Sequence, residues 1–340
     1  MSSAHREKSV SNSSPSHEYN SGGQKSPMIS IIIPTYYEKD NLRKLYEELV
    51  QVLIPLEMTW ELIFVDDGSA DGTWNEITVL HQRDARVKGL RFSRNFGHQY
   101  AIFAGLSNSY GRAVITMDAD LQHPPAVIPQ LLEEWRKGQK IVHTVRIDHR
   151  NTSWAKRITS LMFYKVFSFL SGLELSVGMA DFRLLDRQVV DELLQFGETG
   201  LFLRGLVHWV GYSSSRIEFQ CRDRFSGESK YNLRKMLRFA WTGISSFSII
   251  PLRMGIILGL ITSLLAFLEL IYVSWAKLFT DETVPGWASG VGVISFLFGI
   301  LFILLGVLGE YIGRILVEVR GRPRFIISEQ VGFTSHDASL

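Results

Sequence analysis

Two long apolar segments in the C-terminal third constrain the fold of this 340-residue chain more than any other feature. Residues 254–276 carry a single charge, Glu269, and residues 287–308 carry none. A helix needs about 20 apolar residues to cross the hydrocarbon core of a bilayer. We therefore expect two transmembrane helices within residues 251–313, joined by the short loop 277–286 into a hairpin, rather than two buried helices of a soluble core.

Basic residues flank the two apolar segments. Lys230, Arg234, Lys235, Arg238 and Arg253 precede the first segment, and Arg314, Arg320, Arg322 and Arg324 follow the second. The connecting loop holds only Lys277, beside Asp281 and Glu282. Because basic residues favour the cytoplasmic side, we expect an integral protein of the cytoplasmic (inner) membrane with two spans, both termini and the preceding domain being cytoplasmic. Glu269 is costly in lipid and indicates a helix–helix contact, for example in a homo-oligomer.

The first 27 residues are expected to form a disordered tail. They contain nine serines and almost no apolar side chains, so they cannot contribute to a core. They also lack the apolar segment of a signal peptide, which agrees with a cytoplasmic N-terminus. The single cysteine, Cys221, excludes an intramolecular disulfide and a thiolate metal cluster, and the net charge of +2 gives no reason to expect nucleic acid as a partner.

Residues 28–228 alternate short apolar runs with helical patterns and are predicted to form one α/β domain. Strand-like runs occur at 28–36, 60–66, 87–93 and 112–117, and amphipathic segments separate them. This β-α-β-α order predicts a Rossmann-like, mostly parallel sheet with helices on both faces. Ligands of such sheets bind beyond the carboxyl ends of the strands.

Polar clusters follow all four predicted strands: Pro34-Thr35-Tyr36-Tyr37-Glu38, Asp66-Asp67-Gly68-Ser69, Ser93-Arg94-Asn95 and Asp118-Ala119-Asp120. Asp118 and Asp120 stand two residues apart, where like charges repel, and a bound divalent cation would remove that repulsion. Oxygen ligands suit Mg²⁺ or Mn²⁺, and Gln122 offers a carbonyl oxygen to the same centre. The sequence therefore predicts a metal site at these three residues, whereas the cluster that begins at Asp66 also fits an ordinary turn.

Six segments resemble glycosyltransferase family 2: SIIIPTYYEKDNL, LIFVDDGSADGT, RFSRNFGHQYAIFAGL, VITMDADLQHPP, ADFRLLDRQVVDEL and RFSGESKYNLRKMLRFAWTGI. The resemblance covers about residues 28–325 and is strongest to polyisoprenyl-phosphate glycosyltransferases, the bactoprenol (undecaprenyl-phosphate) glucosyltransferases and the dolichyl-phosphate mannose synthases. Tyr37 stands where the family usually has Asn, but the neighbouring motif residues Thr35 and Glu38 are present. The resemblance implies a GT-A type nucleotide-sugar fold.

By this resemblance, a set of strand-end residues lines the nucleotide-sugar pocket: Pro34, Thr35, Tyr36, Glu38, Asp66, Asp67 and Arg94. Asp66 or Asp67 would bond the base or ribose, and Arg94 would reach the diphosphate unless it forms a surface ion pair. Asp118, Asp120 and Gln122 would hold the metal on the diphosphate. His98 and His123 have no carboxylate partner visible in the sequence and are expected to have positional roles.

The acceptor phosphate is predicted to meet Arg183, Arg222, Arg224, Ser229 and Lys230, four of which lie in a glycine-containing loop. The alternative for this loop is an ordinary solvated basic segment. The loop precedes a basic amphipathic segment, 229–250. We expect this segment and segment 154–170 to lie on the membrane surface. The alternative for both is that they pack on the sheet. The resemblance makes Asp181 the candidate catalytic residue, as a base or as a group that orients Arg183.

The resemblance implies an inverting glycosyltransferase that moves a hexose, glucose from UDP-glucose, onto undecaprenyl or another polyprenyl phosphate. A phosphate acceptor is already nucleophilic and needs no strong base. The alternatives are the same reaction with GDP-mannose, a processive polysaccharide synthase, whose Q-x-x-R-W segment this chain lacks, and a non-catalytic scaffold. The expected organisation is a tail (1–27), a cytoplasmic catalytic domain (28–228), a juxtamembrane helix (229–250), the hairpin (251–313) and a cytoplasmic C-terminal tail (314–340).

Overall fold

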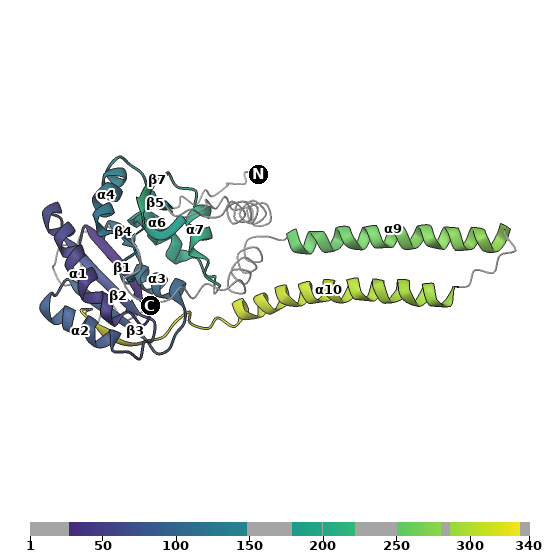
Figure 1. Ribbon diagram of the computed structural model, residues 1–340, viewed down its shortest axis with the longest axis horizontal. Coiled ribbons are helices and arrows are strands. Elements are labelled where there is room, and N and C mark those ends of the chain that lie inside the picture. The colour runs from purple at the N-terminus through teal and green to yellow at the C-terminus, as the bar shows by residue number, and fades with distance from the viewer. Residues whose placement is uncertain (1–26, 148–178, 199, 222–249, 280–285, 334–340) are drawn as a thin grey trace, which may run out of the picture.

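A computed structural model describes residues 27–147, 179–198, 200–221, 250–279 and 286–333 of the chain. Its body is a sheet of eight strands with helices on both faces, and two long helices extend from this body side by side (Figure 1). The strands are β1 (Ile29–Thr35), β2 (Trp60–Asp66), β3 (Val87–Phe92), β4 (Ala113–Thr116), β5 (Ile141–Ile147), β6 (Met179–Asp186), β7 (Ser214–Gln220) and β8 (Ile327–Val331). They are arranged in the order β7-β5-β6-β4-β1-β2-β3-β8.

The four central strands, β4-β1-β2-β3, are parallel to one another, as the sequence predicts. Every residue of β1 and β2 is buried, as expected for parallel strands that helices cover on both faces. The sheet as a whole is mixed, because β6 runs antiparallel to β4 and β5, and β8 runs antiparallel to β3. Beyond β6, strands β5 and β7 are parallel to each other and run in the same direction as the central strands. Among the described strands, only β6 and β8 therefore depart from the mostly parallel sheet that the sequence predicts.

Helices cover both faces of the sheet and bury its apolar side chains. The helices of the body are α1 (Lys39–Leu53), α2 (Thr73–Arg83), α3 (His98–Ser107), α4 (Ile128–Arg136), α6 (Arg187–Gln195) and α7 (Leu203–Trp209), with short 3-10 turns η1 (Ile54–Leu56) and η2 (Pro125–Val127). Helices α1, α2 and α4 pack on one face, in one cluster with Ile31 and Phe64. Helices α3, α6 and α7 pack on the other face around Ile32. The periodic apolar stripes of the sequence become these two core layers.

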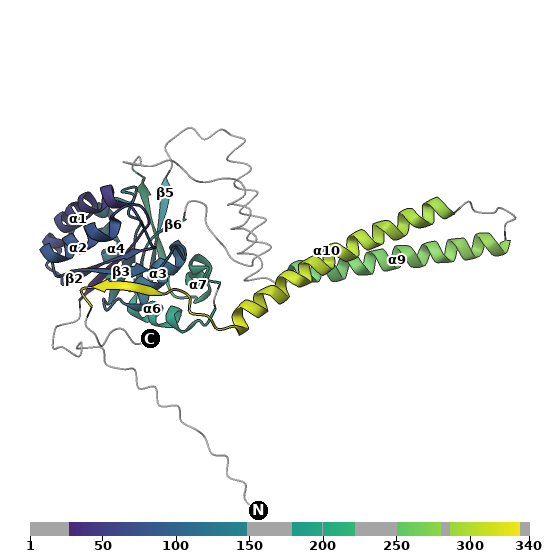
Figure 2. The same ribbon diagram turned by 90° about the horizontal axis from the view of Figure 1, so that it is seen from below.

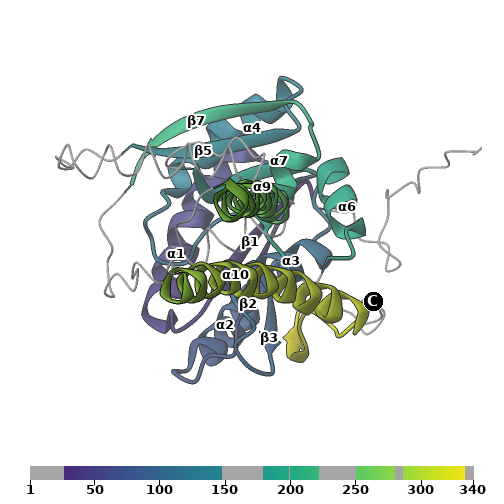
Figure 3. The ribbon, with the colours of Figure 1, turned by 90° about the vertical axis from the view of Figure 1, so that its right-hand side faces the viewer.

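Two long helices, α9 (Ile250–Phe279) and α10 (Trp287–Val319), contact each other and lead away from the body, as Figure 3 shows from the far end of the pair. Large apolar side chains on both are exposed, for example Leu264 at 59% and Phe302 at 66%. Within the described residues, one segment, Phe296–Val319 of α10, is long and apolar enough to cross a membrane. This single candidate span differs from the pair that the sequence predicts.

The chain returns from the end of α10 to the sheet and adds β8 beside β3, as the yellow arrow in Figure 2 shows. This strand was not predicted from the sequence. Gly89 of β3 makes room for it, because a Cβ atom there would lie 2.9 Å from a methyl group of Val331 and 2.6 Å from one of Ile77. The segment after the long helices is thus part of the α/β body.

Candidate active site at the strand ends

The loops after β2 and β3 are held together by a buried carboxylate, Asp67. Its Oδ1 accepts hydrogen bonds from the backbone N–H groups of Phe96 (2.7 Å) and Gly97 (3.2 Å), and its Oδ2 accepts a second bond from Gly97 (2.9 Å). Burial raises the pKa of Asp67 above its ordinary value, although these hydrogen bonds lower it. Gly68 has φ +75°, and a Cβ atom there would lie 2.6 Å from the carbonyl carbon of Arg94, so only glycine permits this close approach.

The neighbouring carboxylate, Asp66, is fully buried at the end of β2. Its Oδ1 accepts a hydrogen bond from the N–H of Ser69 (3.0 Å), so the ordinary turn considered from the sequence is present. Its Oδ2 is buried and accepts no hydrogen bond from the described residues, although the Nε of Arg91 lies 3.6 Å away. Burial raises the pKa of Asp66. One oxygen of Asp66 is thereby available to a ligand.

The end of β1 supplies the other residues predicted for the nucleotide. Pro34 and Thr35 are buried in the strand, and Tyr36, the next residue, is 43% exposed. Glu38 accepts a hydrogen bond from the Nδ2 of Asn41 (2.5 Å) at the start of α1. These residues therefore lie at the same edge of the sheet as Asp66, because β1 and β2 are adjacent and parallel.

Arg94 is exposed and does not form the surface ion pair considered from the sequence with any described residue. Its guanidinium lies over the ring of Phe96, 4.0 Å from the ring centroid, and donates a hydrogen bond to the carbonyl of Asn95 (3.0 Å). It belongs to the loop that Asp67 holds in place, so it is on the same side of the sheet as the other strand-end residues.

The two aspartates of the predicted metal site, Asp118 and Asp120, lie just beyond β4. The Oδ1 of Asp118 is buried without a hydrogen bond from the described residues, and the Oδ1 of Asp120 accepts one from the N–H of Gln122 (3.2 Å). Two carboxylates fit a hard divalent cation that keeps diphosphate or water oxygens as its other ligands. The side-chain oxygen of Gln122 instead faces Arg146 (3.4 Å) and Cys221 (3.7 Å), so Gln122 fits this role less well. The described residues contain no cluster of three or more His, Cys, Asp or Glu side chains suited to a metal.

Both histidines near the aspartates have carboxylate neighbours that the sequence did not reveal. The Nε2 of His98 lies 3.4 Å from Asp118 and 3.6 Å from Asp181. Desolvation lowers the pKa of His98, but the nearby carboxylates of Asp181 and Asp118 raise it above its ordinary value. His123 accepts a hydrogen bond from the N–H of Asp118 (3.0 Å) and stacks on Phe182, a geometry that agrees with the positional role expected for it.

Asp181, the candidate catalytic residue, is buried on β6 between two arginines. Its Oδ1 accepts hydrogen bonds from Arg183 (2.7 Å) and Arg204 (2.9 Å), and its Oδ2 accepts a second bond from Arg204 (2.9 Å). Burial opposes ionisation, but the charges of Arg204 and Arg183 hold the pKa of Asp181 well below its ordinary value. This arrangement favours an orienting role for Asp181 over that of a base, because both of its oxygens are already engaged.

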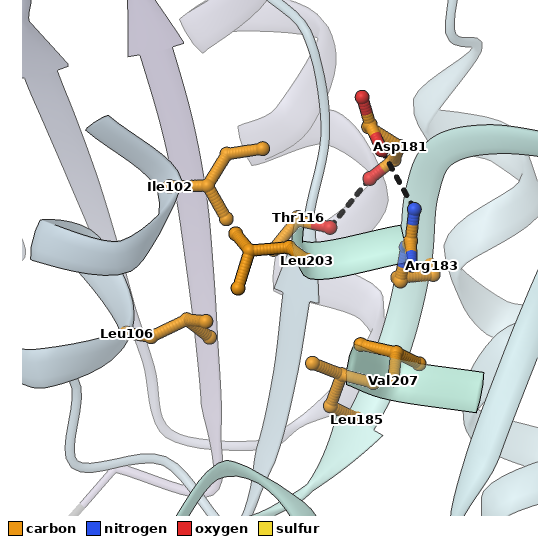
Figure 4. Close-up of a pocket in the computed structure, with 8 residues that line it drawn as sticks. All are labelled: Ile102, Leu106, Thr116, Asp181, Arg183, Leu185, Leu203 and Val207. Carbon is orange, nitrogen blue, oxygen red and sulfur yellow. Dashed lines mark hydrogen bonds and ion pairs between the residues drawn. The ribbon is translucent and has the colours of Figure 1, made fainter. Parts of the chain in front are cut away.

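A small cavity lies beside this carboxylate, with Asp181 and Arg183 on its polar side and aliphatic side chains on the other (Figure 4). The Nη1 of Arg183 is buried without a hydrogen bond from the described residues. The hydroxyl of Thr116 bonds the carbonyl of Asp181. The aliphatic side chains are those of Ile102, Leu106, Leu185, Leu203 and Val207.

The remaining acceptor residues of the sequence analysis, Arg222, Arg224, Ser229 and Lys230, lie outside the described residues. So do segment 154–170 and all but the last residue of segment 229–250, both of which are expected at the membrane surface. Their placement stays a prediction.

Comparison with known proteins now identifies the family. The model of the family described as Glycosyl transferase family 2 matches residues 30–194. An uncharacterized glycosyltransferase of Bacillus subtilis (strain 168), YkcC, is 41% identical over 307 residues, which cover 89% of this chain and 94% of that protein. The SfII prophage-derived bactoprenol glucosyl transferase of Shigella flexneri is 39% identical over 306 residues, with 88% and 97% covered.

The chain belongs to glycosyl transferase family 2. Its mixed sheet with helices on both faces is the GT-A-like arrangement that the resemblance implies. The crystal structure of mannosyl-3-phosphoglycerate synthase from Rubrobacter xylanophilus is similar at 15% identity with a TM-score of 0.43, over 76% of this chain and 78% of that one. That likeness is too loose to inform the site.

Two arginines of the site in this family 2 glycosyltransferase were not predicted from the sequence. Arg204 comes from α7, 23 residues after the carboxylate that it binds, and no local pattern links the two. Arg91 lies within β3, where its alternation with buried neighbours is that of an ordinary strand residue. The only available signal was the position of Arg91 three residues before Arg94, near a strand end.

Proposed function

We propose that this family 2 glycosyltransferase transfers a hexose, glucose from UDP-glucose, onto undecaprenyl or another polyprenyl phosphate, with inversion at the anomeric carbon. The observation that carries the proposal is the gathering of Asp66, Asp67, Asp118, Asp120 and Asp181 at one edge of the sheet. Similarity to a bactoprenol glucosyl transferase over most of the chain supports the choice of acceptor and sugar.

The donor nucleotide is proposed to bind over the ends of β1, β2 and β3. The Oδ2 of Asp66, which is buried and accepts no hydrogen bond from the described residues, is suited to accept one from the base or ribose. Asp118 and Asp120 would hold Mg²⁺ or Mn²⁺ against the diphosphate; the ion would supply charge neutralisation of the leaving nucleoside diphosphate. Gln122 remains a weaker third ligand because its side chain is engaged elsewhere.

The acceptor phosphate is proposed to bind near Asp181. A phosphate monoester is largely dianionic near neutral pH, so it can attack the sugar without a base. Asp181 would then hold Arg183 and Arg204 in place to receive the phosphate, and the buried, unpaired Nη1 of Arg183 supports such a role. The predicted basic loop with Arg222 and Lys230 would add further charge.

The long helices are proposed to cross the cytoplasmic membrane as a two-span hairpin, with the catalytic body and both termini in the cytoplasm. Exposed apolar side chains along α9 as well as α10 support two spans, since a soluble protein rarely exposes so large an apolar surface. Close contact of Gly255 on α9 with Leu304 on α10 supports a packed pair. The basic residues before α9 and after α10 support the orientation.

The proposal is tested with the full chain in detergent, undecaprenyl phosphate and a panel of radiolabelled UDP-glucose, GDP-mannose and UDP-GlcNAc. We expect the label of UDP-glucose to enter the organic phase in a reaction that EDTA stops. An Asp120→Ala variant should lose this transfer, and an Lys137→Ala variant, altered in an exposed ion pair at the C-terminal end of α4, should keep it. Transfer of no label would refute the function, and undiminished transfer by Asp120→Ala would refute the metal assignment.

A further inference from the structure

Strand β8 brings a carboxylate, Glu329, to the nucleotide end of the sheet. Glu329 lies directly opposite Arg91 in the antiparallel register of β8 and β3. Its Oε1 accepts a hydrogen bond from the Nη1 of Arg91 (2.5 Å), and its Oε2 accepts one from the indole Nε1 of Trp74 on α2 (2.9 Å). Both oxygens are thus occupied, and the carboxylate is fixed between a strand and a helix.

Arg91 connects this carboxylate to the turn that contains Asp66. Its Nη2 donates a hydrogen bond to the carbonyl of Ser69 (3.2 Å), at the other end of the turn. Its Nε lies 3.6 Å from the Oδ2 of Asp66, too far for a hydrogen bond but near enough for charge attraction. The guanidinium is therefore held just short of the oxygen that the proposed function assigns to the nucleotide.

The position of Glu329 is also fixed from the side of the long helices. Residues 320–326 connect α10 to β8, and the ring of Phe325 stacks on Phe92 of β3 at 5.0 Å between centroids. The guanidinium of Arg324 lies over the ring of Phe103 of α3, 4.4 Å from its centroid. Figure 2 shows this short connection running along the body before it enters the sheet.

We propose that Glu329 is a positioning residue for the donor nucleotide, acting through Arg91 on Asp66, so that the strand after the long helices completes the nucleotide site. This inference rests on the proposed function, which assigns Asp66 to the base or ribose. With Glu329 in place, Arg91 neutralises the site but leaves one oxygen of Asp66 open. Without it, the guanidinium is released to bond Asp66 directly and to occupy the oxygen that the nucleotide needs.

The test uses the full chain in detergent and measures the binding of UDP alone and of GDP alone by calorimetry, together with donor and acceptor kinetics. For Glu329→Ala we expect nucleotide affinity to fall, and donor KM to rise, about 5- to 20-fold, as for loss of one charge-assisted hydrogen bond. The kcat and the KM for undecaprenyl phosphate should stay within about twofold, because the change acts on donor binding. Glu329→Gln, which keeps an acceptor for Arg91, should restore part of the affinity.

Gln330→Ala is the matched control, because it alters the next residue of the same strand, whose side chain points to the other face. It should bind nucleotide as the wild type does. In an Arg91→Ala background, Glu329→Ala should have no further effect on nucleotide binding, since Glu329 acts through Arg91.

Three outcomes would overturn the inference. Unchanged nucleotide affinity in Glu329→Ala would do so directly. A fall in kcat and in thermal stability that matches the loss of nucleotide affinity would also overturn it, because it would show that Glu329 only stabilises the fold. If the wild type itself binds neither UDP nor GDP, the proposed function fails and the inference fails with it, so the two failures are distinguishable.

Discussion

Asp181 shows how partners far apart in the sequence decide the chemistry of a residue. The carboxylate is 7% exposed, and its pKa lies well below the ordinary value of 3.8 because two arginines outweigh the effect of burial. A carboxylate with a lowered pKa contributes stability that is present above pH 3.8 and lost as the pH falls below it. Asp181 therefore stays ionised throughout the neutral range, and an acidic limb of the pH–rate profile above about pH 4.5 belongs to another group.

Replacing Arg204 with alanine should remove two of the three arginine hydrogen bonds to Asp181. We expect a loss of about 2 kcal/mol of stability, because a buried carboxylate loses charged donors, and at least about a tenfold fall in kcat. Thermal melting and transfer kinetics measure the two effects. Arg204→Lys, which keeps the charge, should be intermediate, whereas wild-type kcat in Arg204→Ala would exclude a role for this arginine in orienting the acceptor site.

His143, which is buried on β5, leads to a separate prediction about how the stability of the protein depends on pH. Burial and the nearby charges of Arg183 and Arg216 lower its pKa to about 3, from 6.5. Between pH 6.5 and about pH 3, His143 binds a proton more readily in the unfolded chain than in the folded chain. The free energy of unfolding therefore decreases as the pH falls below 6.5. Between pH 7 and pH 5 the loss is about 2 kcal/mol.

A His143→Gln variant removes the titrating group and should lose less stability over that interval. Melting temperatures of both proteins at pH 7 and pH 5 give the comparison, and the difference in slope can be read even if the variant is less stable overall. Equal slopes would show that another group causes the acid sensitivity of the wild type.

At the scale of elements, helix α3 is fixed to the sheet by a close approach between Gly105 and Ile32 of β1. A Cβ atom at Gly105 would overlap the side chain of Ile32, so Gly105→Ala should cost about 1–3 kcal/mol by overpacking. Because α3 begins at His98, the shift should also lower activity. The control is Gly197→Ala, where a Cβ atom meets nothing within 4 Å. Chemical denaturation measures both, and equal stability of the two variants would contradict tight packing at Gly105.

The elements that could be predicted from the sequence are those with a local pattern. The four parallel strands were predicted correctly because each is a short apolar run followed by a cluster of polar residues. Strand β8 (Ile327–Val331) has no such run. It joins the sheet by pairing with β3, a strand more than 230 residues earlier in the chain. The same limit applies to the site, where motifs indicated Asp66 and Asp118, but not the contact of Arg204 with Asp181.

At the scale of the whole molecule, the α/β body and the long helices have opposite surfaces. The body buries its apolar side chains in two core layers, whereas α9 and α10 expose theirs along most of their length. In water, such a surface would favour aggregation, and in a bilayer it is the stable arrangement. Because β8 follows α10 and pairs within the sheet, the proposed membrane spans would hold the strand ends close to the bilayer in which a polyprenyl phosphate would be delivered.

A two-span hairpin makes a definite prediction about topology. With two spans, Gly286, the residue before α10, faces the side opposite to the body, whereas Gln330 on β8 stays with the body in the cytoplasm. In a Cys221→Ser background, which removes the single natural cysteine, one new cysteine is introduced by Gly286→Cys or by Gln330→Cys. On intact cells, a membrane-impermeant maleimide should label the first variant only, and after permeabilisation it should label both. Protection of both positions in intact cells would indicate a chain that lies on the membrane without spanning it twice, and labelling of the Gln330→Cys variant alone would indicate the reverse orientation.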